Sequence, residues 1–158
     1  MKFNLTKYTT KEEVFKKVEE YLLSFMRVSY VDKSRPWGGF FVIDEGDADH
    51  FITEYFPHLT RESLSISGKL SPKILIVESN KRLSWQYHNR RAEIWKMLDG
   101  QANVIISETD IPSSEKHFLP SDIIELKQGE RHRLQGWDDW AIIAEIWRHT
   151  DPINPSDE

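Results

Sequence analysis

Two histidines and a glutamate stand out because their types and spacing could hold a metal ion. In the run over residues 83–88, strand side chains alternate, so Gln86 and His88 are expected on one face. Glu93 opens the next apolar run, and His132 follows a glycine turn further along the chain. Two imidazoles, a carboxylate and an amide oxygen form a suitable ligand set for a borderline divalent cation. The same polar residues would also suit a sheet face exposed to solvent, without any metal.

The composition narrows the available chemistry. The 158-residue chain has no cysteine, which excludes disulfides, thiolate ligands and a cysteine nucleophile. Its 21 basic and 26 acidic residues give a net charge of -5, and this acidic balance argues against a nucleic-acid-binding surface. No signal peptide is recognised, and no apolar run approaches the ~20 residues of a membrane span. We therefore expect a cytoplasmic protein with no nucleic-acid or membrane partner.

An amphipathic helix is predicted near the N-terminus. Apolar residues recur at helical spacing over residues 14–26, and Thr10 followed by Glu13 has the form of a capping box. A second, shorter helix is expected after Asp47 and should end at Pro57. The mixed charges on the polar face of the first helix favour packing on its own domain over binding to a membrane.

The second half of the chain is rich in short β-type runs separated by turn residues. Such regular spacing is typical of an all-β sandwich or barrel and disfavours a parallel sheet with crossover helices. The predicted strands cover residues 40–43, 73–77, 83–88, 93–98, 103–107, 122–126 and 140–147, with a further short strand at His132. The predicted division is a helical extension over residues 1–33, a β-barrel domain over 34–150 and a polar C-terminal tail over 151–158.

The spacing of the candidate ligands resembles the two sequence motifs of the cupin superfamily. Gln86, His88 and Glu93 are spaced as in the first motif, with glutamine in place of its first histidine. Gly129, two residues and His132 have the form of the second motif.

Residues 83–95 narrow the resemblance to one branch of the cupins. They read LSWQYHNRRAEIW and are similar to the Leu-Ser-Leu-Gln-x-His-x-His-Arg-Ala-Glu-His-Trp run of type II phosphomannose isomerases. Residues 129–134 (GERHRL) and 35–38 (RPWG) match further motifs of that family. Arg90 stands where the family has its second histidine, and Ile94 replaces the histidine after the glutamate.

This resemblance implies a cupin jelly-roll, an antiparallel β-barrel, with the N-terminal helical extension added to an all-β core. It implies that Gln86, His88, Glu93 and His132 bind one divalent metal ion, usually zinc in this family. Manganese, nickel, cobalt or iron would suit the same ligands. The implied reaction is aldose–ketose isomerisation of a sugar phosphate such as mannose 6-phosphate, through an enediolate.

Isomerisation also needs cations for the substrate phosphate and a group that moves a proton. Arginine gives forked contacts to phosphate. The candidates for phosphate binding are Arg35, Arg90, Arg91 and Arg133. Strand parity suggests Glu145 and Lys96 as candidates for proton transfer, although each would also suit an exposed strand position.

Two other functions remain open. His88, His132 and Glu93 would suffice as the two-histidine, one-carboxylate site of an Fe(II)-dependent oxygenase or lyase. A non-catalytic, sugar-binding or regulatory cupin is favoured by Arg90, where the family has a histidine. By analogy with other cupins, we expect a homodimer.

Overall fold

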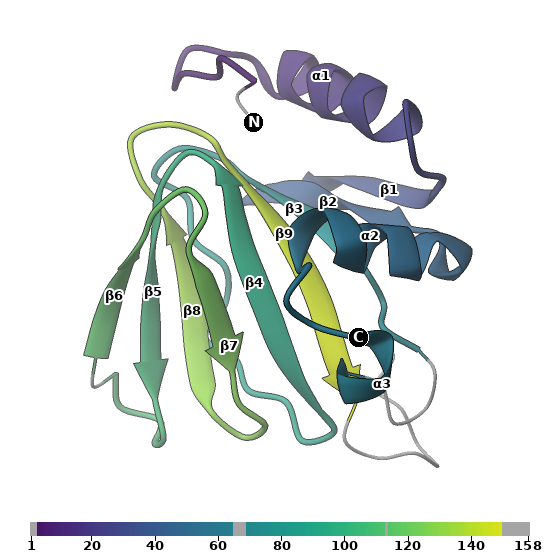
Figure 1. Cartoon of the computed structure of the whole chain (residues 1–158). Helices are drawn as coiled ribbons and strands as arrows, with labels where there is room; N and C mark the ends of the chain where they lie inside the picture. Colours follow the sequence, from purple (N-terminus) through teal and green to yellow (C-terminus); the bar gives the residue numbers. More distant parts are fainter. Residues whose placement is uncertain (1–2, 65–68, 113, 150–158) are drawn as a thin grey trace.

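The computed structural model describes residues 3–64, 69–112 and 114–149, which form two antiparallel sheets with helices on one side (Figure 1). The larger sheet has the strand order β1 (Val28–Arg35), β2 (Gly38–Ile43), β3 (Lys73–Val77), β9 (Ala141–His149), β4 (Arg91–Asp99) and β7 (Ile123–Leu126). The smaller sheet has the order β6 (Ser114–Phe118), β5 (Ala102–Ser107) and β8 (Arg131–Gly136). All neighbouring strands are antiparallel.

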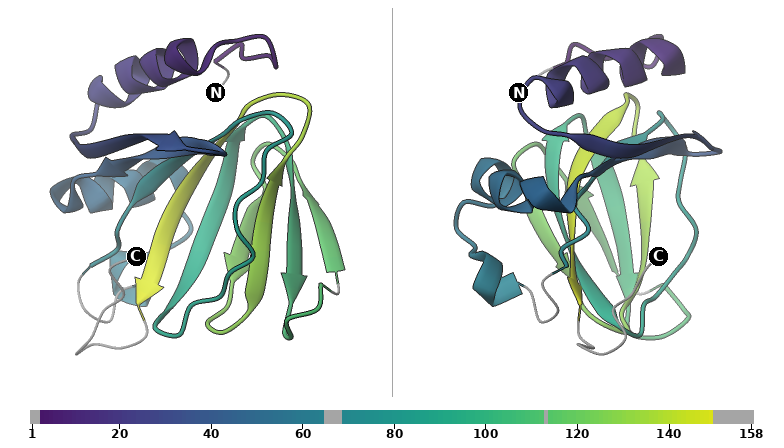
Figure 2. Two further views of the ribbon diagram at one scale, coloured as in Figure 1. Left: turned by 180° about the vertical axis from the view of Figure 1, so that it is seen from behind. Right: turned by 90° about the vertical axis from the view of Figure 1, so that its right-hand side faces the viewer.

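The helices cover the outer face of the larger sheet (Figure 2). They are α1 (Lys11–Leu23), the 3₁₀ turn η1 (Glu45–Asp47), α2 (Ala48–Tyr55) and the single turn α3 (Arg61–Leu64). The side-chain oxygen of Thr10 accepts a hydrogen bond from the Glu13 amide at 3.2 Å, which confirms the predicted N-cap. Among the described helices, none is both long enough and apolar enough to cross a membrane.

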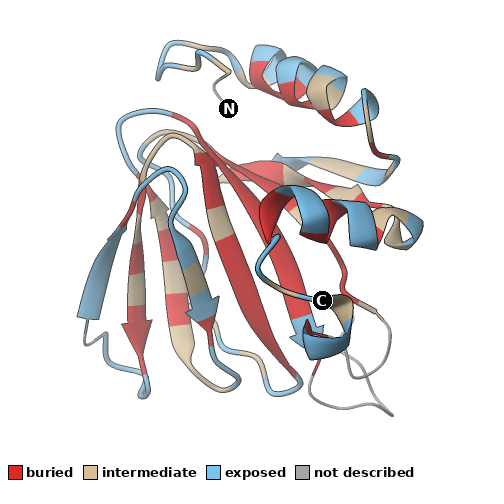
Figure 3. Ribbon diagram, viewed as in Figure 1, coloured by how far each residue is buried: buried red, intermediate tan, exposed pale blue. Residues whose placement is uncertain are grey.

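Two hydrophobic cores share the larger sheet as a common wall. One core lies between this sheet and the helices and includes Phe15, Phe51 and Ile142. The other lies between the two sheets and includes Trp95, Leu134 and Ile143. Figure 3 shows that β4 and β9 are buried along most of their length, because each has one face in each core. Side chains that alternate along β9 therefore enter the two cores in turn.

The structure confirms the predicted all-β core and the predicted N-terminal helix. One of the predicted strands does not form. The predicted strand over residues 83–88 is an irregular segment that meets β8 only at isolated bridges. The amides of Leu83 and Gln86 donate to the carbonyls of Leu134 and His132, respectively. An interval of three residues in this segment therefore lies opposite an interval of two residues in β8. The extra residue interrupts the ladder in the manner of a bulge.

Strands β1 and β6 were not predicted. Both lie at sheet edges, and most of their residues are exposed or half-buried. The predicted division between residues 33 and 34 remains a prediction, and β1 includes residues on both sides of it. The predicted tail over residues 151–158 lies outside the described residues.

Candidate metal centre and its cavity

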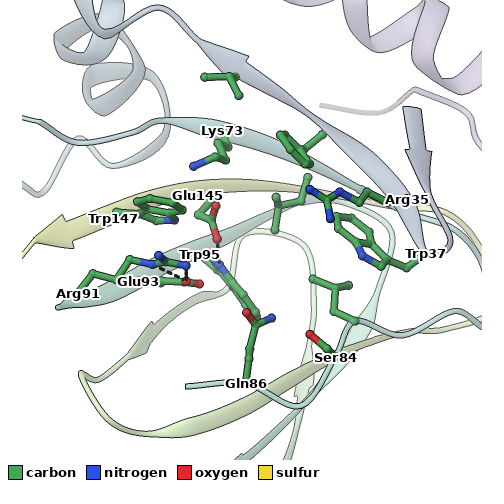
Figure 4. A pocket seen from close by; sticks show the side chains of 14 residues that line it. Arg35, Trp37, Lys73, Ser84, Gln86, Arg91, Glu93, Trp95, Glu145 and Trp147 are labelled. Atoms are coloured by element: carbon green, nitrogen blue, oxygen red, sulfur yellow. Dashed lines mark hydrogen bonds and ion pairs between the residues drawn. The ribbon is translucent and has the colours of Figure 1, made fainter. Parts of the chain in front are cut away.

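A cavity of ≈ 440 Å³ opens beside the inner face of the larger sheet (Figure 4). Its walls come from strands β1 to β4 and β9, the turn between β1 and β2, and the irregular segment at residues 83–86. The charged, polar and indole side chains that line it are Arg35, Trp37, Lys73, Ser84, Gln86, Arg91, Glu93, Trp95, Glu145 and Trp147. Three tryptophans and five charged groups in one cavity suit a polar ligand with an extended surface.

His88, Glu93 and His132 converge next to this cavity, with one ligand atom of each lying within 4.8 Å of the others. His88 Nε2 lies 2.9 Å from Glu93 Oε1, and His132 Nε2 lies 3.8 Å from Glu93 Oε2. Ligands at the usual 2.0–2.1 Å from a tetrahedral zinc ion would be roughly 3.3 Å apart. These separations bracket that value, so the three side chains fit a small divalent cation.

The local structure explains why three distant residues meet. Glu93 alternates with Trp95 along β4, so both side chains point to the interior of the barrel. His132 enters the same interior from β8, and its backbone exchanges hydrogen bonds of 2.8 and 3.1 Å with Gln86. The carbonyl of His88 accepts a 2.8 Å bond from the Gly129 amide, which ties the loop before β4 to the turn before β8.

The hydrogen bonding of His132 leaves one ring nitrogen for a ligand. Its Nδ1 lies 3.3 Å from the Glu130 carbonyl oxygen, so a proton on Nδ1 leaves a lone pair on Nε2. Nε2 is buried and has no hydrogen-bond partner in the described part of the chain. Burial lowers the pKa of His132, although the Glu93 charge opposes this, and the imidazole is therefore neutral at pH 7. Metal binding requires a neutral imidazole with a free lone pair on one ring nitrogen, and His132 Nε2 meets this requirement.

Arg91 supplies the positive charge beside Glu93. Its Nη2 lies 3.0 Å from Glu93 Oε1 and 3.1 Å from His88 Nε2, and both side chains of the Arg91–Glu93 pair are buried. Burial alone would raise the pKa of Glu93, but the hydrogen bond with His88 and the charge of Arg91 hold it well below its usual range. Coordination of a metal by His88 Nε2 would require the guanidinium to give up that contact.

Residues 48–136, more than half of the chain, match the family described as "Mannose-6-phosphate isomerase C-terminal". This chain belongs to that family.

Two relatives of low sequence identity are named as alginate biosynthesis proteins. The alginate biosynthesis protein AlgA of Pseudomonas aeruginosa is 29% identical over 112 residues, which are 61% of this chain and 23% of AlgA. AlgA of Pseudomonas fluorescens is 29% identical over 115 residues, which are 63% of this chain and 23% of that protein. The chain therefore spans less than a quarter of the length of these relatives.

Solved structures with little sequence identity share the fold. Vicilin from tomato has a TM-score of 0.56 at 18% identity, covering 83% of this chain and 33% of vicilin. Drosophila melanogaster CENP-C bound to CAL1 has a TM-score of 0.55 at 11% identity, covering 87% and 98% of the two chains. KdgF from a Halomonas species has a TM-score of 0.51 at 11% identity, covering 79% and 93%. These similarities concern the fold alone and confirm the expected cupin barrel.

Three of the four metal ligands implied by the mannose-6-phosphate isomerase resemblance have side chains that lie close together. His88, Glu93 and His132 form the cluster described above. Gln86 lines the cavity from the irregular segment and joins His132 through the backbone, while its amide faces Trp95 (Figure 4).

The candidate phosphate-binding arginines divide into two groups. Arg35 and Arg91 line the cavity, and each is paired with a carboxylate: Arg35 Nε lies 3.1 Å from Asp32 Oδ2. Arg90 is exposed and does not line the cavity. Arg133 alternates with His132 and Leu134 along β8 and so points away from the barrel interior.

The two candidates for proton transfer lie on opposite faces of the larger sheet. Glu145 lines the cavity, and its Oε1 accepts a 2.9 Å hydrogen bond from Trp95 Nε1. Burial and the neighbouring charge of Glu93 raise the pKa of Glu145 to about 7. Lys96 follows Trp95 on β4 and points toward the opposite face, outside the cavity lining.

Lys73 is a cavity residue that the sequence analysis did not single out. It precedes the apolar run of β3, pairs across the strands with Glu145, and points into the barrel as Leu75 does. Burial lowers the pKa of its ammonium, while the charge of Glu145 opposes the shift. The signal in the sequence was a lysine at an interior-facing position of an otherwise apolar strand.

Proposed function

We propose that this chain is a metal-dependent sugar-phosphate isomerase that acts on mannose 6-phosphate or a related aldose phosphate. The observation that supports this most strongly is the buried His88–Glu93–His132 cluster, with an orphaned His132 Nε2, beside a cavity of polar and indole side chains. Membership of the mannose-6-phosphate isomerase C-terminal family supports the choice of reaction.

The metal would be one divalent ion, most simply zinc, held by His88, Glu93 and His132 with Gln86 nearby. When bound, it would polarise the substrate oxygens at C1 and C2 and stabilise the negative charge of the enediolate.

Glu145 is the proposed acid–base residue. It would take the proton from C2 of the aldose and return it to C1, while the hydroxyl proton of O2 would pass to O1, so the isomerisation leaves no net proton on the enzyme. Its hydrogen bond with Trp95 Nε1 fixes one oxygen and orients the carboxylate in the cavity. The Arg91 guanidinium carbon lies 3.6 Å from the centroid of the Trp147 ring. Arg91 would balance the charge of Glu93 and hold that carboxylate in its orientation as a metal ligand.

A second candidate is a non-catalytic, sugar-binding cupin. The contacts of Arg91 Nη2 with both Glu93 and His88 favour it, because a guanidinium that neutralises the cluster competes with a metal ion. An Fe(II)-dependent oxygenase or lyase is the third candidate, on the same two histidines and one carboxylate.

A coupled isomerase assay separates these functions. Chelator-treated protein is reloaded separately with Zn, Mn, Co, Ni or Fe(II) and given mannose 6-phosphate, while bound metal is measured by elemental analysis. Glu93→Gln should abolish turnover and stoichiometric metal binding, and Glu115→Gln, an exposed change on β6, should leave both intact. Stoichiometric metal without turnover would refute the isomerase and favour the sugar-binding cupin, and iron-dependent oxygen consumption would favour the oxygenase.

The same proposal includes a homodimer located in the cytoplasm. Light scattering behind a sizing column tests the first, since a monomer of 18.7 kDa would contradict it. Fractionation of cells that produce the protein tests the second.

A further inference from the structure

We infer that Lys73 binds the anionic group of the substrate, on the opposite side of the Trp147 ring from Arg91. This inference rests on the proposed function for the identity of the ligand as a sugar phosphate. It assigns the anion to a residue on β3 in place of the arginines that the sequence suggested.

Lys73 is the cavity cation that has no carboxylate partner. Arg35 is paired with Asp32, and Arg91 is paired with Glu93. Among residues 3–64, 69–112 and 114–149, no carboxylate oxygen lies within 4.0 Å of Lys73 Nζ. Glu145, its cross-strand neighbour, acts on the ammonium through its charge without forming an ion pair with it. A half-buried ammonium with no carboxylate in direct contact can therefore accept an anion at Nζ.

The ring of Trp147 holds the ammonium in place. Lys73 Nζ lies 3.4 Å from the centroid of the Trp147 ring, and the Arg91 guanidinium lies 3.6 Å from the same centroid. Figure 4 shows Lys73 and Arg91 on opposite sides of this ring, with Glu145 between Lys73 and Glu93. The cation–π contacts fix the direction of the ammonium without neutralising its charge.

The order of the strands sets the distance that the ligand would have to span. Lys73, Glu145 and Trp95 are direct cross-strand neighbours on β3, β9 and β4, and Glu93 is two residues before Trp95. The backbones of β3 and β4 are thus two strand spacings apart, about 10 Å. A hexose with its reacting carbons between the His88–Glu93–His132 cluster and Glu145 would direct its C6 group toward β3.

The charge of the cavity agrees with an anionic ligand. Its lining holds three cations (Arg35, Lys73 and Arg91) and two carboxylates (Glu93 and Glu145), and Asp32 pairs with Arg35 beside it. The cavity is thus close to neutral in a chain whose net charge is -5. A bound divalent metal ion would make it positive and would attract anions.

The anion has two possible chemical sources at the same position of a hexose: a 6-phosphate or the carboxylate of a hexuronate. Both would accept from the Lys73 ammonium. The proposed function favours the phosphate, because the family takes its name from mannose 6-phosphate.

Binding measurements on zinc-loaded protein test the inference without relying on turnover. Mannose 6-phosphate, mannuronate, mannose and inorganic phosphate are each titrated by calorimetry, with tryptophan fluorescence as a second readout of binding to the cavity, which three tryptophans line. The variants are Lys73→Met, which keeps the apolar stem on the indole ring, Lys73→Arg, which keeps the charge, and Lys116→Met as an exposed control on β6.

We expect Lys73→Met to weaken mannose 6-phosphate binding by about tenfold to hundredfold, the value of a hydrogen bond to a charged group. Mannose binding should be unchanged, Lys73→Arg should recover most of the loss, and Lys116→Met should match the wild type. Equal losses for mannose and mannose 6-phosphate, no loss in Lys73→Met, or a wild type that binds no anion would each overturn the inference.

The outcomes also separate this inference from the proposed function. Anion binding that depends on Lys73 in a protein without isomerase activity would uphold the subsite and refute the isomerase. Loss of mannuronate binding in Lys73→Met, with mannose 6-phosphate unaffected, would uphold the anion site and identify a carboxylate as its ligand.

Discussion

Replacing Arg91 by methionine should destabilise the protein far more than its place in a cavity wall suggests. The side chains of Arg91 and Glu93 are only 5% and 4% exposed. Removing one member of such a buried pair leaves the other charge without its counter-ion and costs about 3–5 kcal/mol. For a chain of this size, each kcal/mol lowers the melting temperature by about 2–4 °C, so we expect a decrease of about 6–20 °C.

A double-mutant cycle measures how much of this cost is the unpaired charge. Glu93→Gln combined with Arg91→Met removes both charges, and the double variant should be more stable than the sum of the single changes by at least ~1 kcal/mol. Excess zinc should recover part of the stability of Arg91→Met, because the ion would place positive charge beside Glu93. Stability is measured by urea unfolding followed by circular dichroism.

An exposed ion pair provides the matched control. Arg148 and Glu125 lie 3.5 Å apart with side chains 46% and 52% exposed, so Arg148→Met should change stability by about 1 kcal/mol or less. The reasoning would be refuted if Arg91→Met cost no more than this control, or if the two changes in the Arg91–Glu93 cycle were strictly additive.

Three further predictions concern pH, catalysis and the first helix. Burial and the charges of Lys69, Arg91 and Lys73 lower the pKa of His149 to about 4, whereas an unfolded histidine titrates near 6.5. The unfolded state therefore binds more protons between these values, and stability should fall as the pH decreases from about 6.5 to 4. Urea unfolding of the wild type and of His149→Gln should show a shallower decrease in the variant, and parallel curves would contradict this assignment. Glu145→Gln should lower kcat for mannose 6-phosphate by about 10²- to 10⁴-fold while circular dichroism shows an intact fold; a kcat within threefold of the wild type would remove Glu145 from proton transfer. Thr10→Ala should cost about 1 kcal/mol through loss of the helix N-cap, and Thr10→Ser should restore most of it, as measured by thermal unfolding.

The spacing of polar residues predicted the grouping of two histidines and a glutamate better than the strand pattern predicted the structure around them. His88, Glu93 and His132 were identified from their types and intervals, and the structure brings them together. The strand predicted over residues 83–88 failed because one extra residue between Leu83 and Gln86 interrupts the pairing with β8, and no local feature of the sequence marks such a bulge.

The hydrophobic pattern of the sequences of β4 and β9 does not show which face of the sheet each side chain lies on. An alternating hydrophobic pattern reveals the inner face of a strand only when the other face meets water. Because both strands are buried on both faces, the sequence could not distinguish Lys96 from Glu145 as the candidate for proton transfer. Of the two, Glu145 lines the cavity. Arg91 was expected at the phosphate, and its pairing with Glu93 depends on a long-range arrangement that spacing does not encode.

The shared wall between the two cores means that the N-terminal helix is a structural part of the barrel. Residues 48–136 match the family, yet α1, β1 and β2 precede this region and β9 follows it. A fragment cut at residue 34 would remove α1 and uncover Phe41, which is now fully buried with its ring centroid 5.3 Å from that of Phe15. An apolar area of that kind promotes aggregation in water. The region common to the family therefore lacks three of the six strands of the larger sheet, β1, β2 and β9, and could not form this barrel without the segments on either side of it.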